Sequence, residues 1–256
     1  MTKRLNEIVL GTPIAHGNTA DIFLWENKIV KLYKEHLPES EAGNEAKKQL
    51  AAYSSGLPVP KVLEVSKVNG RQVLIMEYVK GETLGDLLQK NIEKTEYYLS
   101  VSVDLQMNMH KKETNELVDM PEKLRRQLKN ASILTETQKE GLIQKLSTMV
   151  YEPRICHGDF HLYNLVQSDE NFTILDWVDA SSGDIRADVY RSYLLYSEVS
   201  SELAENYLRI YCEKSGLNKT EIMEWAPIIA GARLSENVSS ENEKYLMKIV
   251  AGDRQE

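Results

Sequence analysis

The stretch His-Gly-Asp-Phe-His-Leu-Tyr-Asn, residues 157–164, places an aspartate five residues before an asparagine. Two short apolar segments follow it, residues 165–167 and 172–175, and the turn-forming residues 168–171 lie between them. This pattern predicts a loop that leads into a β-hairpin. Because the hairpin ends at Asp176, it would bring that residue back beside Asn164, so Asp159, Asn164 and Asp176 are predicted to converge.

These three side chains suit phosphoryl transfer. One carboxylate must orient the attacking hydroxyl and accept its proton, while an amide oxygen and a second carboxylate hold magnesium on the nucleotide phosphates. Asp159, Asn164 and Asp176 fit these roles in that order, and the spacing matches the Asp-x-x-x-x-Asn of kinase catalytic loops. The competing interpretation is a hairpin in which Asp and Asn only cap turns. It would be preferred for Asp159 alone, but the whole ordered string favours kinase chemistry.

The longer pattern is His-Gly-Asp-Phe-His-x-x-Asn, then Leu-Asp-Trp at 175–177, then Gly183, Asp184 and Asp188. It resembles the aminoglycoside phosphotransferase and choline kinase-like family. The resemblance implies an α+β, protein-kinase-like fold with an antiparallel sheet and one helix in a small lobe and a mostly helical large lobe. It also implies transfer of the γ-phosphate of ATP, or another nucleoside triphosphate, to a small-molecule hydroxyl with Mg²⁺. Asp188 would accept backbone N–H groups from the catalytic loop; the alternative is an acid at a helix N-terminus.

Composition limits the function classes. The chain has 256 residues, 42% hydrophobic and 27% charged, which is typical of a globular protein with one large domain or two lobes. The net charge of −8 argues against a nucleic-acid binder and is compatible with a cationic acceptor, although an acidic surface more often serves solubility. Two cysteines, no signal-peptide core and no long apolar run predict a cytoplasmic protein outside the membrane. The oligomeric state stays open.

Residues 7–33 predict three strands: one beginning at 8–10, one at 21–25 and one at 28–33, with a turn of small residues at 15–20. In a kinase small lobe the first turn covers the nucleotide phosphates, but here it contains only Gly17 rather than a glycine-rich motif. The order of strands makes Lys31 the match to the kinase lysine that binds the α/β-phosphates. An exposed edge lysine is the alternative.

Residues 38–55 predict a helix. Glu41 and Glu45 lie one turn apart on it, and one of them should pair with Lys31, as in kinases. The resemblance favours Glu45, which otherwise could form a surface pair with Lys48. The predicted packing stripe of this helix comprises Ala42, Ala46, Gln49, Leu50 and Tyr53.

Residues 62–65 and 73–78 predict strands around the turn at Asn69-Gly70. The following segment, residues 76–81, resembles the one that joins kinase lobes. The resemblance therefore implies that the backbone of Glu77 and Tyr78 binds the adenine edge. It places a nucleotide-binding lobe at residues 1–79 and a helical lobe with the catalytic loop and substrate site at residues 80–256.

The large lobe is predicted to be mostly helical, with a polar loop at 178–184. Its predicted helices cover residues 83–90, 97–110, 121–130, 136–149, 189–198, 201–215, 220–236 and 241–250. The substrate would lie between the Asp159 loop and the helices after residue 195. Acidic residues there could pair with substrate amines, or they could simply form solvated helix faces: Asp179, Glu198, Glu202, Glu205 and Glu236.

Two function classes are compatible with the sequence. The first is a kinase of a small hydroxylated molecule, with aminoglycosides, choline-like alcohols, sugars and amino alcohols all open as acceptors. The second is a catalytically inactive kinase-fold protein with a binding or regulatory role. Such a protein would have lost the base, the amide, the metal aspartate or the lysine, and all four are present. A protein kinase lacks support because no Ala-Pro-Glu follows Asp176.

Overall fold

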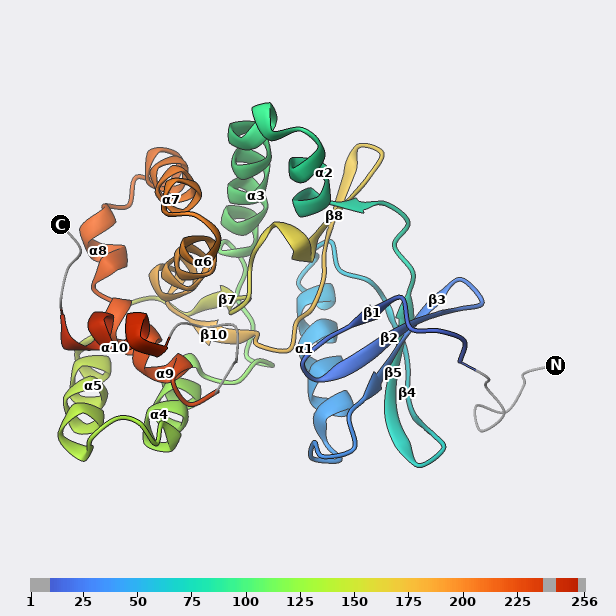
Figure 1. Ribbon diagram of the computed structural model, residues 1–256, viewed down its shortest axis with the longest axis horizontal. Helices are drawn as coiled ribbons and strands as arrows, with labels where there is room; N and C mark the ends of the chain where they lie inside the picture. Colours follow the sequence, from blue (N-terminus) through green and yellow to red (C-terminus); the bar gives the residue numbers. More distant parts are fainter. Residues whose placement is uncertain (1–9, 237–242, 253–256) are drawn as a thin grey trace. The chain divides into compact units, whose positions relative to one another are not determined.

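The computed structural model describes residues 10–236 and 243–252, which group into two compact units (Figure 1). The first unit contains the chain up to residue 87 together with residues 163–178, and the second contains residues 88–162 and the chain from residue 179. The hairpin after the catalytic loop thus groups with the N-terminal part of the chain. The functional division into lobes 1–79 and 80–256 stays a prediction.

The first unit is built on a five-stranded antiparallel sheet in the order β1-β2-β3-β5-β4. Two tight turns join its strands, and Glu26, Asn27, Asn69 and Gly70 there have positive φ, as primed hairpin turns require. Both hairpins confirm the sequence prediction. The strands are β1 (Ala15–His16), β2 (Ala20–Trp25), β3 (Lys28–Tyr33), β4 (Val62–Val68) and β5 (Arg71–Glu77).

The start of the sheet corrects one expectation. Leu10 lies outside any strand, and Ile8 and Val9 fall outside the described residues. The first strand is instead Ala15–His16, inside the segment predicted as a turn. Small and polar residues gave no strand signal there, but pairing with β2 orders them.

Helix α1 (Glu41–Ser54) packs on one face of the sheet (Figure 1). Its apolar buried residues are all alanines, and Ala42 and Ala46 belong to a cluster that includes Tyr33 and Leu74. The helix begins three residues later than predicted. Two members of its predicted stripe, Leu50 and Tyr53, are exposed, whereas Glu45, Ala51 and Ala52 are buried. A narrow row of alanines is sufficient where a helix lies close to a sheet, so the large residues flank the contact.

The predicted hairpin after the catalytic loop is present as β8 (Leu165–Ser168) and β9 (Asn171–Ile174). A short strand that the sequence did not reveal, β6 (Glu82–Thr83), pairs with β8. Gly81 permits this pairing, because a Cβ there would lie 2.1 Å from the carbonyl oxygen of Gln167. Helix α2 (Leu84–Lys90) follows β6.

The second unit is mostly helical, as predicted. Helix α7 packs against α3 and α6, and α9 packs against α4, α5 and α10 (Figure 1). The helices are α3 (Thr95–Met109), α4 (Met120–Asn130), α5 (Glu136–Thr148), α6 (Ile185–Val199), α7 (Ser201–Ser215), α8 (Lys219–Met223), α9 (Ala226–Arg233) and α10 (Glu243–Ala251), with short 3₁₀ turns at Ile92–Lys94 and Leu162–Asn164. The fold is therefore α+β.

Three features of this unit correct the sequence prediction. Residues Ser181–Gly183 form a strand, β10, that pairs with β7 (Arg154–Cys156), within the predicted polar loop. The predicted helix 220–236 is two helices, because Pro227 sits in the first turn of α9. Helix α6 begins at Ile185, capped by the Asp184 side chain, so Asp188 lies inside it rather than at its start.

None of the helices within the described parts of the chain combines the length and the apolarity needed to span a bilayer.

Candidate active site

A buried cluster of opposite charges lies between the sheet and α1 in the first unit. The Nζ of Lys31 on β3 donates to Glu45 Oε1 at 2.5 Å and to Asp176 Oδ1 at 3.1 Å. Lys31 is 7% exposed and Glu45 2%, because α1 turns its buried row toward β3. Of the two glutamates that the sequence left open, Glu45 is the partner of Lys31, and Glu41 at the start of α1 is not.

The charge of Lys31 is secured by its neighbours. Burial alone would lower its pKa, but the carboxylates of Asp176 and Glu45 raise the pKa of Lys31 to about 12. The hydroxyl of Tyr33 donates to the other oxygen of Glu45. Tyr33 follows Lys31 by two residues and therefore lies on the same face of the strand. This spacing could have indicated the contact between Tyr33 and Glu45, which the sequence analysis did not predict. The cluster keeps a cation fixed in place.

Asn164 and Asp176 lie at the same end of the β8–β9 hairpin. The amide of Leu175 donates to the carbonyl of Asn164 at 2.8 Å, which places the two flanking segments side by side. Asp176 has a left-handed φ of 59°, and its side chain is 45% exposed despite the contact with Lys31. The backbone therefore turns this carboxylate out of the hairpin toward solvent.

These two residues fit a magnesium ion. Mg²⁺ binds through one or two carboxylates, with waters and substrate phosphates completing its shell. A half-exposed carboxylate, in a segment whose backbone pairs with Asn164, matches that requirement. A dedicated metal cage of the protein would need several such ligands together. No group of three or more His, Cys, Asp or Glu side chains that could hold a metal occurs among the described residues.

Asp159 lies in the second unit. Its Oδ1 is 3.4 Å from Arg191 Nη2, and its Oδ2 is 3.4 Å from His161 Nε2. Burial alone would raise its pKa, but the hydrogen bond from His161 and the charge of Arg191 lower the pKa of Asp159 well below its usual range. Asp159 is consequently a carboxylate at neutral pH. Arg191 lies three residues after Asp188 on the same helix, a spacing that could have pointed to it.

Asp188 anchors the loop that contains Asp159, as the sequence analysis expected. The amide of Gly158 donates to Asp188 Oδ1 at 2.6 Å, and His110 Nε2 and Gln106 Nε2 bond to Oδ2 at 2.9 and 3.0 Å. His110 Nδ1 in turn bonds to the hydroxyl of Tyr211 at 2.7 Å. Gly158 has φ of 80°, and a Cβ there would lie 2.7 Å from a backbone carbonyl, so only glycine fits. This buried network fixes the loop that contains Asp159.

The remaining predicted nucleotide-binding residues, Glu77 and Tyr78, lie at the end of β5. The amide of Glu77 donates to the carbonyl of Lys61 at 2.9 Å, and Glu77 pairs with Lys28 of β3. An adenine edge would thus have to bond to the Glu77 carbonyl or to the backbone of Tyr78. Their role stays a prediction.

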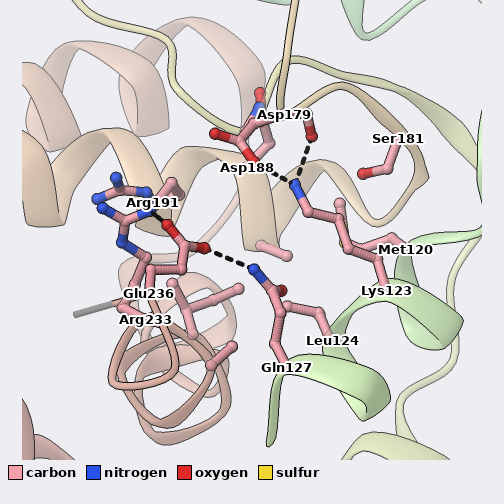
Figure 2. A pocket seen from close by; sticks show the side chains of 14 residues that line it. Met120, Lys123, Leu124, Gln127, Asp179, Ser181, Asp188, Arg191, Arg233 and Glu236 are labelled. Atoms are coloured by element: carbon pink, nitrogen blue, oxygen red, sulfur yellow. Dashed lines mark hydrogen bonds and ion pairs between the residues drawn. The ribbon is translucent and has the colours of Figure 1, made fainter. Parts of the chain in front are cut away.

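A pocket opens beside the catalytic loop within the second unit (Figure 2). Asp179 and Glu236, two of the acids proposed for substrate amines, line it, but both have partners in the chain. Lys123 Nζ donates to Asp179 Oδ1 at 2.7 Å, and Glu236 accepts from Arg233 and, at 2.5 Å, from Gln127. Helix α4 supplies Lys123 and Gln127. The sequence analysis missed both, because their partners lie far away in the sequence.

The other three acids lie away from that pocket. Glu205 accepts from Lys219 Nζ at 2.6 Å and from the hydroxyl of Tyr193 at 2.9 Å, whereas Glu198 and Glu202 are exposed residues of α6 and α7. The idea of a row of acids available to substrate amines is therefore not supported at Asp179, Glu205 or Glu236. Each of these carboxylates already has a cation of the chain beside it.

Comparison with known proteins gives a family. A model of the phosphotransferase enzyme family (APH) matches residues 11–225. Similar solved structures include a choline/ethanolamine kinase family protein from Mesorhizobium loti, with 14% identity, coverage of 96% of this chain and 88% of that one, and a TM-score of 0.62. A thermostable mutant of aminoglycoside phosphotransferase APH(4)-Ia, in a ternary complex with AMP-PNP and hygromycin B, is 11% identical. The match covers 94% of this chain and 91% of that one, with a TM-score of 0.68. The gentamicin complex of APH(2")-IIa is 18% identical, and the match covers 95% of this chain and 91% of that one, with a TM-score of 0.62.

At these identities the solved structures show that the fold is protein-kinase-like, as predicted from the sequence. A search of curated protein sequences finds no match to the chain.

Proposed function

Because the chain belongs to the phosphotransferase enzyme family, we propose that it transfers the γ-phosphate of ATP, or of another nucleoside triphosphate, to a hydroxyl of a small molecule. The observation that supports this most strongly is the buried cluster of Lys31, Glu45 and Asp176. Burying a lysine with carboxylates costs desolvation energy that their attraction only partly offsets, so such a cluster is weak evidence for a purely stabilising role. A nucleotide phosphate is the anion that such a lysine would meet.

Each residue of the first unit has a role in this proposal. Lys31 contacts the α/β-phosphates, and Glu45 holds its side chain in position. Asn164 and Asp176 hold magnesium, which neutralises charge on the phosphates when bound. The backbone of Glu77 and Tyr78 receives the adenine. In support of nucleotide use, the APH(4)-Ia relative was crystallised with AMP-PNP.

Asp159 acts on the acceptor hydroxyl. Its lowered pKa keeps it ionised and makes it a weak base, so its main contribution is to orient the hydroxyl by accepting a hydrogen bond. The proton transfers late, when the bond to phosphorus has formed and the oxygen has become acidic. The Asp188 network supports this work because it holds the Gly158 amide next to Asp159.

A location in a reducing cytoplasm accompanies the proposal. Cys156 and Cys212 are both free thiols, and burial raises the pKa of Cys156 well above its usual value, so it is an inert buried side chain.

The function is tested by a screen for phosphate transfer. The protein is incubated with Mg·ATP and panels of alcohols, sugars, amino alcohols and aminoglycosides, and the products are measured by mass spectrometry. We expect a gain of one phosphate on at least one acceptor that depends on magnesium and disappears in Asp159→Asn. Tight nucleotide binding with no transfer to any acceptor would favour the inactive, regulatory alternative.

A further inference from the structure

The pocket of Figure 2 adjoins the proposed catalytic residue within one structural unit. Gly158, the neighbour of Asp159, lines it, and so does Arg191, whose Nη2 is 3.4 Å from Asp159 Oδ1. An acceptor bound there would lie beside the carboxylate that has to orient its hydroxyl. The walls of this pocket should thus reveal the chemical class of the acceptor.

Two of the carboxylates on these walls are paired with cations that also line the pocket. Asp179 receives Lys123, which donates both to its Oδ1 and to its carbonyl oxygen at 2.7 Å (Figure 2). Glu236 receives Arg233 and the amide of Gln127.

Of two further aspartates, Asp188 also lines the pocket, and Asp159 lies outside the lining beside Arg191. Asp159 receives Arg191, and Asp188 is directed to His110, Gln106 and the Gly158 amide. Every carboxylate at the pocket therefore has a donor of the chain.

This balance disfavours a charged acceptor. An ammonium group that leaves water needs a carboxylate to itself, and here it would have to displace Lys123 or Arg233. An anionic acceptor meets the converse obstacle, because the carboxylates of Asp179 and Glu236 lie next to the cations that would bind it.

An uncharged acceptor meets neither obstacle. Hydroxyl groups can both donate to the paired carboxylates and accept from the paired cations without disturbing the net charge. Ser181 and Gln127 add neutral hydrogen-bonding groups to the lining, and Met120, Leu124 and Ile229 add apolar contact for carbon skeletons.

We propose that the acceptor of this phosphotransferase is a neutral polyhydroxylated compound, of the polyol or uncharged sugar class. Lys123 and Arg233 determine this specificity by neutralising Asp179 and Glu236. The inference rests on the proposed function and narrows its acceptor from any hydroxylated small molecule to one class.

The first test compares acceptors of equal size and different charge. Each set contains a neutral member, its amine and its carboxylate, such as glycerol with serinol and glycerate, or glucose with glucosamine and gluconate. Calorimetry measures binding in the presence of Mg·AMP-PNP, and initial rates give kcat/KM with Mg·ATP. We expect the neutral member to be preferred at least about tenfold in the sets that bind. Preference for the amines or carboxylates, or binding of no neutral compound while nucleotide binds, would overturn the inference.

The second test removes the neutralising cations. Lys123→Gln and Arg233→Gln each leave one pocket carboxylate without its cation, so the ratio of amine to neutral affinity should rise about tenfold. Lys129→Gln is the matched control, since it makes the same charge change at an exposed position on α4 and should leave the ratio unchanged. Thermal melting verifies that the variants fold. Unchanged ratios in both folded pocket variants would show that the ion pairs do not set specificity.

Nucleotide affinity distinguishes a failure of the proposed function from a failure of the acceptor assignment. If wild-type protein fails to bind AMP-PNP with magnesium, the proposed function itself fails. If it binds nucleotide and transfers phosphate, but prefers amines, only the assignment of the acceptor class fails.

Discussion

Lys31 contributes to the fold, and in the proposed function it also binds nucleotide; the two contributions can be separated. Lys31→Met should weaken nucleotide binding strongly, and it should also cost about 3–5 kcal/mol of unfolding free energy because Glu45 is left buried without its cation. Adding Glu45→Gln should restore stability, since the amide can still accept from Tyr33, but should not restore nucleotide binding.

Urea denaturation and calorimetry with AMP-PNP measure these two quantities. Lys47→Met, an exposed change on α1, is the control for the lost charge. If the double variant regains nucleotide affinity together with stability, Lys31 is a structural residue only.

Asp176 should determine the dependence on magnesium. Asp176→Asn removes the anionic oxygen that the metal requires, so magnesium should no longer strengthen nucleotide binding. Asp169→Asn is a close control, because Asp169 is exposed in the turn of the same hairpin and has a similar left-handed φ of 54°. Calorimetric titration of nucleotide at several magnesium concentrations makes the comparison. Wild-type magnesium dependence in Asp176→Asn would remove it from the metal site.

The protonation of Asp159 gives a prediction in pH. Its folded pKa is lowered, so its contribution to stability is present above the unfolded pKa of about 3.9 and is lost as pH falls through the folded value. The carboxyl ¹³C resonance, assigned by its absence in Asp159→Asn, should show its titration step only below about pH 4. A step between pH 5 and 7 would mean that burial outweighs His161 and Arg191, and Asp159 would then be a stronger base than we describe.

At the scale of elements, the helices α3 and α6 hold the catalytic loop through Asp188. Asp188→Ala leaves the Gly158 amide, His110 and Gln106 without their shared acceptor in a buried site, which should cost about 3–5 kcal/mol of unfolding free energy. Asp104 on α3 forms an exposed ion pair with Lys214 on α7, and Asp104→Ala should cost about 1 kcal/mol or less. Equal losses in the two variants, measured by urea denaturation, would contradict the anchoring role.

The same scale shows where sequence reasoning was sufficient. Strong local signals identified the hairpin turns at Asn69-Gly70 and at residues 168–171, and they also gave the order of strands that singled out Lys31. Where chemistry depended on a motif of fixed spacing, as with Asp188 and the Gly158 amide, the predicted contact is present.

Sequence reasoning failed where structure depends on distant partners. Strands β7 and β10 are three residues each, and Ser181–Gly183 has no intrinsic preference for a strand, so only their pairing defines them. The contact of Lys123 with Asp179 joins residues far apart in the chain, and no local pattern reports it. The break before α9 was the exception, since Pro227 was a visible signal for it.

At the scale of the whole molecule, family and fold restrict the reaction but leave the acceptor open. The similar solved structures include complexes with hygromycin B and with gentamicin and a choline/ethanolamine kinase family protein, and each is at most 18% identical to this chain. A net charge of −8 is compatible with a cationic acceptor, yet the charges of the pocket are matched in pairs. The local arrangement is the better guide, because an acceptor is bound by the walls of its site and not by the average charge.

The central claim is that Asp159 is the catalytic residue of a phosphotransferase, and single-turnover transfer tests it most directly. Wild-type protein and Asp159→Asn are each mixed in excess over radiolabelled ATP, with magnesium and an acceptor from the screen, and nucleotide affinity is measured on the same samples. We predict that Asp159→Asn binds Mg·ATP as wild type does and transfers phosphate at least about 100-fold more slowly. Transfer at a near wild-type rate, with nucleotide affinity unchanged, would contradict the account.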